Sequence, residues 1–142
     1  PVPINPYNFK NPRRDNVLVS FAGPASNFVS AFLFGITFQL LRNATFIPIN
    51  VSTNVLNLLL AGIGVNLSLA FFNMIPLFPL DGSHILEGLL PYAMAQKYKE
   101  IERYSPFILL GIIIMGNYAG ISILSIVLGP PIHYFLRLFT GL

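Results

Sequence analysis

One carboxylate and two asparagines are the polar residues of this chain whose positions favour chemistry. Asp81 follows two prolines at the end of a run, residues 43–80, that contains no Asp, Glu, Lys or Arg. An ionisable side chain at or near membrane depth is costly, and such residues usually serve a function. Asn73 lies eight residues before Asp81, and Asn27 lies in the preceding apolar run. These three side chains are the candidate site residues.

Asp81 also has a purely structural interpretation. Aspartate is a good helix N-cap, whose side chain accepts the backbone N–H two or three residues on, and an isolated Asp-Gly pair favours that interpretation. Here, however, Pro76 and Pro79 end regular helix just before Asp81. Irregular backbone at membrane depth is tolerated only where it is buried in protein or lines a wet cavity. Together with the two asparagines, this context favours a functional role for Asp81.

Few other residues could bind a metal or transfer a proton. The chain has two histidines and no cysteine, which excludes thiolate sites and disulfides. His84 lies within one helical turn of Asp81, but one His and one Asp fall short of the three protein ligands usual at a catalytic zinc. We therefore expect His84 to be a structural or supporting residue, His133 to be a packing or interfacial residue with its polar atoms satisfied, and Glu87 to be solvated.

The composition indicates a membrane protein. Hydrophobic residues make up 54% of the 142 residues and charged residues 9%, with a mean hydropathy of +0.70, whereas soluble domains are about 25% charged. The charge-free runs 16–41, 43–80 and 104–136 each exceed the roughly 20 residues that cross a bilayer. The net charge of +3 comes from basic residues in loops beside these runs, which argues against a nucleic-acid partner.

These runs predict an all-α membrane protein, a bundle of three to four transmembrane helices that forms a single domain over residues 1–142. We expect the first span over about 17–41 and the second over about 53–75. Beyond residue 104, the apolar segment contains Gly116, Asn117 and a Gly129-Pro130-Pro131 break. It forms either one span to about residue 128 plus an interfacial helix, or two short segments that turn near Asn117.

The first two spans each carry a stripe of small and polar residues at three- and four-residue spacing. Such stripes let helices pack closely, so we expect them to face protein. The positions are Ala22, Gly23, Ser26, Asn27, Ser30, Ala31 and Gly35 in the first span, and Gly62, Asn66, Ala70 and Asn73 in the second.

The segments outside the spans set the expected topology. Residues 1–16 are interpreted as an extended and juxtamembrane segment, because residues 1–9 combine apolar side chains with prolines, although a disordered terminus fits this composition as well. A short helix is expected from Asp81 to about Leu90, followed by a mixed-charge loop at 97–103. Basic residues cluster before the first span and in that loop, which places the Asp81 end of the second span on the cytoplasmic side.

Two motifs on consecutive spans resemble those of the site-2 protease family of intramembrane zinc metalloproteases. Gly23-Pro24-Ala25-Ser26-Asn27 resembles the family's G-P-x-x-N, and Asn73 to Gly82 resembles its N-x-x-P-x-x-x-L-D-G. The following residues agree with the smaller bacterial members, so the resemblance implies a bacterial cell membrane. It covers most of the chain.

The resemblance implies a zinc ion held by two histidines and by Asp81, with a glutamate as the base that activates the zinc-bound water. It also places Asn27 and Asn73 near the active site, where an amide orients substrate or stabilises a developing oxyanion. The implied substrate is a transmembrane protein or peptide within the lipid bilayer, which the enzyme cleaves by hydrolysis.

One part of the family's site is missing from these 142 residues. The family's two histidine ligands and its base lie in an H-E-x-x-H motif on the helix before Gly23-Pro24, and the sequence has no such motif. We therefore expect these ligands upstream of residue 1 and the chain alone, as the C-terminal part of a protease, to be inactive. The alternative is a non-catalytic membrane-embedded homologue or interaction module. A transporter that uses Asp81 as an ion site would explain neither Asn27 nor the double proline.

Overall fold

The computed structural model describes residues 11–44, 49–118 and 122–142, and in these ranges the chain forms helices and no strand. The helices are α1 (Pro12–Arg42), α2 (Ile49–Asn73), α3 (Asp81–Leu89), α4 (Tyr92–Glu100), α5 (Ser105–Tyr118) and α6 (Ile123–Thr140). The extended segment expected over residues 1–9 lies outside the described residues.

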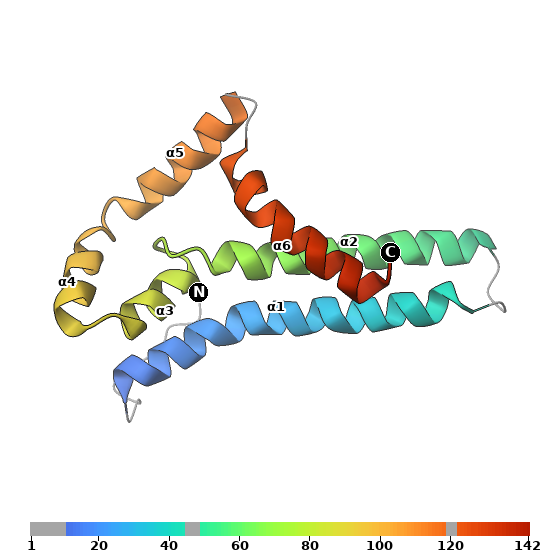
Figure 1. The fold of residues 1–142 in the computed structure, drawn as a ribbon, viewed down its shortest axis with the longest axis horizontal. Helices are drawn as coiled ribbons and strands as arrows, with labels where there is room; N and C mark the ends of the chain where they lie inside the picture. The colour runs from blue at the N-terminus through green and yellow to red at the C-terminus, as the bar shows by residue number, and fades with distance from the viewer. Residues whose placement is uncertain (1–10, 45–48, 119–121) are drawn as a thin grey trace.

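The two longest helices form the centre of the fold. α1 and α2 run antiparallel and pack along each other, and α6 crosses both of them obliquely (Figure 1). Three helical segments are long and apolar enough to cross a membrane, namely α1, Thr53–Asn73 of α2, and α6. The predicted all-α membrane protein is thus confirmed for the described part of the chain.

The core lies where α6 crosses the α1–α2 pair. Its buried residues are Ala31, Phe38, Ile63, Leu67 and Phe139. Phe28 lies edge-on to Phe139 with ring centroids 5.4 Å apart. Gly35 lets α6 approach α1, because a Cβ added at Gly35 would come within 2.8 Å of the Phe139 carbonyl oxygen.

The small-residue stripes face other helices in part. Gly62 leaves room for the ring of Phe34, which would lie 2.9 Å from an added Cβ, and Ala70 is buried. The Asn66 amide donates to the Gly62 carbonyl at 2.8 Å, within its own helix. On α1, Ala31 and Gly35 are buried, whereas Ala22 and Ser26 are exposed. Gly23 is exposed as well. The predicted face is therefore correct for the middle of each helix and wrong at these three positions of α1.

The apolar C-terminal third forms two helices rather than one span with an interfacial helix. α5 ends at Tyr118, next to Asn117, and α6 turns back toward the α1–α2 pair (Figure 1). Ser122 caps α6, since its hydroxyl accepts the Ser125 N–H at 3.2 Å. The break expected at Gly129-Pro130-Pro131 is wrong, because both prolines lie inside α6. Prolines are tolerated in membrane helices where neighbouring groups satisfy the freed backbone carbonyls.

Several helix boundaries differ from the sequence-based prediction. α2 spans Ile49–Asn73 instead of about 53–75. α1 begins at Pro12, five residues before the expected span, because proline suits the first position of a helix, where no N–H is needed. Residues 12–16 are therefore helical and not extended. Residues 97–100, expected in a loop, belong to α4. This polar helix has a tertiary partner, because the Tyr98 hydroxyl donates to the Pro76 carbonyl in the loop before Asp81.

Candidate functional site

Asp81 is the first residue of α3 and not its N-cap. The N-cap is Leu80, which has an extended backbone, and no side chain caps the helix. The N-cap interpretation of Asp81 is therefore wrong. Ser83 instead closes the first turn of α3, because its backbone N–H and its hydroxyl both donate to the Leu80 carbonyl, at 3.0 and 2.6 Å. Within the described residues the Asp81 carboxylate has no hydrogen bond or ion pair.

The carboxylate of Asp81 lies directly against α1 at Gly23. A Cβ added at Gly23 would sit 2.9 Å from the Asp81 Oδ2 atom. The glycine of the G-P-x-x-N motif thus leaves the space that the aspartate of the second motif occupies. Two motifs that are far apart in the sequence therefore meet in the fold.

The start of α3 also packs closely on the end of α2. A Cβ added at Gly82 would overlap the carbonyl oxygen of Met74 and come within 2.6 Å of that of Ile75. Because only glycine fits against these carbonyls, Gly82 lets the backbone of α3 approach the last turn of α2. Asp81 thus lies against α1, with α3 packed along α1 and its start next to the residues that follow α2 (Figure 1).

The two candidate asparagines lie close in sequence to residues that contact Asp81 or Gly82. Asn27 is one helical turn beyond Gly23 on the same side of α1, since residues four apart are neighbours on a helix surface. Asn73 is the last residue of α2. Both side chains are partly buried, and within the described residues neither amide makes a hydrogen bond. Both amides keep their hydrogen-bonding capacity for another group.

The loop between α2 and α3 is held by aromatic contacts. Phe78, at 3% exposure, packs between His84 and Tyr98, with ring centroids 5.5 and 5.3 Å away. The Tyr98 hydroxyl donates to the Pro76 carbonyl at 2.8 Å. Sequence reasoning missed Phe78 and Tyr98. An aromatic residue between two prolines could have indicated Phe78, whereas no pattern connects Tyr98 to this loop.

Charged groups surround Tyr98 on the α3–α4 side. Glu87 lies 3.9 Å from His84 Nδ1 and 3.7 Å from Lys99 Nζ, and its side chain is 25% exposed. Glu87 is therefore only partly solvated, contrary to expectation. Burial, and secondarily the negative charge of Glu87, raises the pKa of Tyr98. The phenol stays protonated at neutral pH and can donate to Pro76.

Neither histidine joins Asp81 in the structure. His84 packs on Phe78 and faces Glu87, as expected for a structural or supporting residue. His133 lies 2.7 Å from the Gly129 carbonyl within α6, so that its Nδ1–H is satisfied locally, as predicted. Across the described ranges, no group of three or more His, Cys, Asp and Glu residues is placed to hold a metal ion.

Asp81 nevertheless fits the role of a single zinc ligand. Its carboxylate oxygen is a donor that zinc accepts in proteins. It lies in the first turn of α3, where the helix dipole favours a negative charge. No described partner competes for it, and the absence of a side chain at Gly23 leaves it room.

The sequence comparisons agree with this arrangement. The profile of Peptidase family M50 matches residues 47–116, which include the whole of the second motif. The protein named "Putative zinc metalloprotease YwhC" from Bacillus subtilis (strain 168) is 38% identical over 83% of this chain. The chain spans 55% of that relative's length. No solved structure matches.

Both motifs and both matches point to the same family. The Gly23 and Asp81 motifs are adjacent in space, and the three membrane-length helices suit an intramembrane enzyme. The chain belongs to the peptidase M50, or site-2 protease, family.

Proposed function

We propose that this chain forms part of the active site of an intramembrane zinc metalloprotease that hydrolyses peptide bonds of membrane proteins. The observation that carries the proposal is the contact between Gly23 and Asp81, which unites the two family motifs at one point of the fold. The family membership and the name of the Bacillus relative support the same reaction.

In this proposal Asp81 supplies one carboxylate ligand to zinc. The resemblance assigns the other two ligands and the base to an H-E-x-x-H motif, which is not among these 142 residues. When bound there, zinc would supply Lewis-acid chemistry, polarising the peptide carbonyl and lowering the pKa of its water. The contribution of this chain is to hold the Asp81 carboxylate in place, through Gly23 on one side and Gly82 on the other. The 142 residues alone would then bind zinc weakly and would not hydrolyse peptides.

Asn27 and Asn73 are proposed to bind the substrate. A carboxamide can donate to the oxyanion that develops on the peptide carbonyl and can accept from the peptide N–H, which fixes the orientation of the substrate. Their partly buried amides, without hydrogen bonds to the described residues, support this role. The substrate is a transmembrane protein or peptide that enters from the bilayer.

The proposed location is a bacterial cell membrane, with the Asp81 end of α2 on the cytoplasmic side. The basic residues support this orientation. Arg13 and Arg14 lie in the first turn of α1, and Lys97, Lys99 and Arg103 follow α3. Both groups lie at the same end of the α1–α2 pair as Asp81, whereas Arg42 lies at the opposite end. Short loops rich in Lys and Arg face the cytoplasm.

The test is made on the full-length protein purified in detergent. Asp81→Asn removes the negative charge at nearly constant volume, and Glu102→Gln, at an exposed position, is the matched control. We expect Asp81→Asn to lower zinc affinity by at least about tenfold. Changes to residues that only support zinc ligands already lower the affinity by this much. Peptidase activity should fall with it. Zinc content and activity equal to those of the control would refute the assignment.

A further inference from the structure

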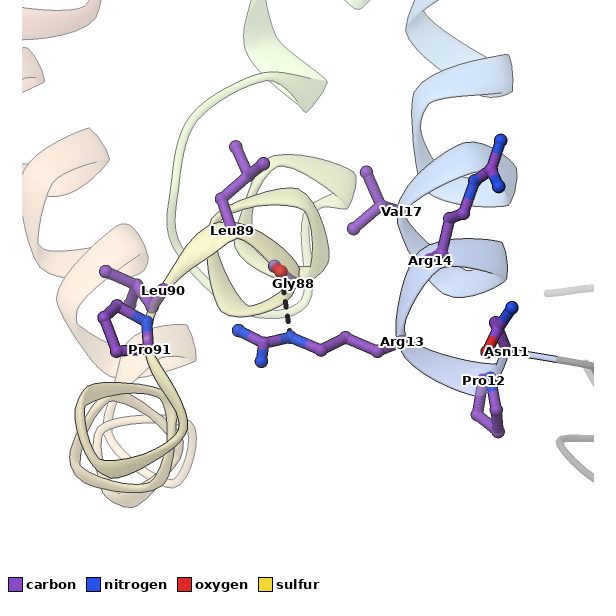
Figure 2. Close-up of a pocket in the computed structure, with 9 residues that line it drawn as sticks. All are labelled: Asn11, Pro12, Arg13, Arg14, Val17, Gly88, Leu89, Leu90 and Pro91. Atoms are coloured by element: carbon purple, nitrogen blue, oxygen red, sulfur yellow. Dashed lines mark hydrogen bonds between the residues drawn. The ribbon is translucent and has the colours of Figure 1, made fainter.

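A pocket of about 650 Å³ opens between the start of α1 and the end of α3. Figure 2 shows the side chains that line it from both helices and from the turn after α3. They include Arg13, Arg14, Val17, Gly88, Leu89 and Pro91. The pocket is built from other residues than Asp81, Asn27 and Asn73, and no step of the proposed hydrolysis uses it.

Arg13 extends across the pocket from α1 to α3 (Figure 2). Its Nε donates to the Gly88 carbonyl at 2.9 Å, in the last turn of α3, where carbonyls lack helical partners. This bond holds the guanidinium in one orientation. Its two terminal nitrogens make no hydrogen bond or ion pair within the described residues and can bind another acceptor. Capping α3 therefore uses only one of the donors of Arg13.

The pocket has a net positive charge. Two arginines and no acidic residue line it. Asp15, the nearest carboxylate in the sequence, is not part of the lining, and its Oδ2 atom accepts the Asn11 N–H at 3.2 Å. Arginine guanidinium groups match phosphate oxygens in geometry and charge, often through two parallel hydrogen bonds. The pocket is thus complementary to a phosphate group.

The position of the pocket along α1 indicates that this phosphate group belongs to a membrane lipid. The charge-free part of α1 starts at residue 16, directly after Arg13, Arg14 and Asp15, so the pocket lies where the membrane-crossing segment begins. Leu89, which lines the pocket, is 72% exposed and presents apolar surface. Basic pockets between membrane helices at this depth bind anionic lipid headgroups.

We propose that this pocket binds the headgroup phosphate of an anionic phospholipid. Arg13 contacts the phosphate, Arg14 adds a second positive charge to the pocket, and the acyl chains lie along the apolar surface of Leu89. Lipid binding then holds the start of α1 and the end of α3 together at the membrane surface, as the bond between Arg13 and Gly88 already does. The proposal does not depend on the protease assignment.

The experiment measures binding of fluorescently labelled phosphatidylglycerol and phosphatidylcholine to the full-length protein in a non-ionic detergent. Arg14→Gln removes one charge without breaking a hydrogen bond of the described structure, and Arg13→Gln/Arg14→Gln removes both charges. The matched control is Arg42→Gln, which removes an exposed arginine from the opposite end of the same helix. Thermal unfolding of each variant in the same detergent shows whether the fold is retained.

We expect phosphatidylglycerol to bind more tightly than phosphatidylcholine. Arg14→Gln should weaken phosphatidylglycerol binding about fivefold, as expected when one positive charge near the membrane surface is lost. The double variant should weaken it more strongly, and Arg42→Gln should leave it unchanged. Equal binding of the two lipids, or an equal effect of Arg42→Gln, would overturn the proposal. So would displacement of the lipid by millimolar inorganic phosphate, since the site would then bind free phosphate. Arg14→Gln decides the question if the double variant unfolds.

Discussion

The Oδ2 atom of Asp81 occupies the space that a side chain at Gly23 would need, since a Cβ there would lie 2.9 Å away. The atom in contact is the far end of a side chain. Asp81 can therefore turn away when the space is filled, while the backbones of α1 and α3 stay in place. A single methyl group at position 23 thus tests the position of the carboxylate separately from the fold.

We predict that Gly23→Ala lowers the zinc affinity and peptidase activity of the full-length protein about tenfold or more, with little change in thermal stability. Supporting contacts around zinc ligands have effects of this size. The matched control is Gly64→Ala on α2, where an added Cβ meets nothing within 4 Å. This control should keep zinc binding and raise stability by up to about 1 kcal/mol, the usual helix preference of Ala over Gly. Zinc binding by Gly23→Ala as tight as that of Gly64→Ala would show that Asp81 does not need this space.

The hydrogen bond from Tyr98 to the Pro76 carbonyl should stabilise the loop that precedes Asp81. Tyr98→Phe removes the hydroxyl and keeps the ring contact with Phe78. We expect a loss of about 0.5–1 kcal/mol in stability at pH 7, as for a typical hydrogen bond. The measurement is thermal unfolding in detergent, with Tyr104→Phe, at an exposed position, as control. Equal transition temperatures for the two variants would contradict the prediction.

The comparison of wild type with Tyr98→Phe also gives a pH prediction. Burial and Glu87 raise the pKa of Tyr98 above its usual value of 10.0. A raised pKa means that the folded state favours the protonated phenol, so its contribution is complete below pH 10 and is lost as the pH rises through the folded-state pKa. The stability difference between wild type and Tyr98→Phe should therefore shrink above pH 10. A constant difference from pH 8 to pH 11 would argue against the raised pKa.

The proposed topology can be tested by labelling single cysteines, because these 142 residues contain none. Glu102→Cys lies beyond α4, on the proposed cytoplasmic side, and Asn43→Cys lies just after α1, at the other end of the bundle. In intact cells of a cysteine-free background, an impermeant maleimide should label Asn43→Cys and spare Glu102→Cys until the membrane is opened. The reverse pattern would invert the proposed orientation.

Much of the fold follows from local properties of the sequence. The charge-free runs predicted the membrane helices, because a segment that crosses a bilayer must be apolar over about 20 residues and must satisfy its own backbone. The motifs around Asn27, Asn73 and Asp81 indicated the family for a similar reason, since each motif is a short contiguous pattern. The start of α1 was less accurate and α4 was not predicted, because helix ends and short polar helices depend on capping and on tertiary contacts.

Only the tertiary structure decided how these parts meet. The proximity of Gly23 to Asp81 and the packing of Gly82 on the Met74 carbonyl depend on the positions of three helices, which no single stretch of sequence contains. The same holds for Tyr98 and Pro76. The sequence by itself thus determined that the chain is a membrane protein and that it carries the two motifs of its family. The tertiary structure alone shows that Asp81 lies against α1 and next to the residues that follow α2. Such close contacts require a small residue on one segment and a matching group on the other, which no single segment reveals.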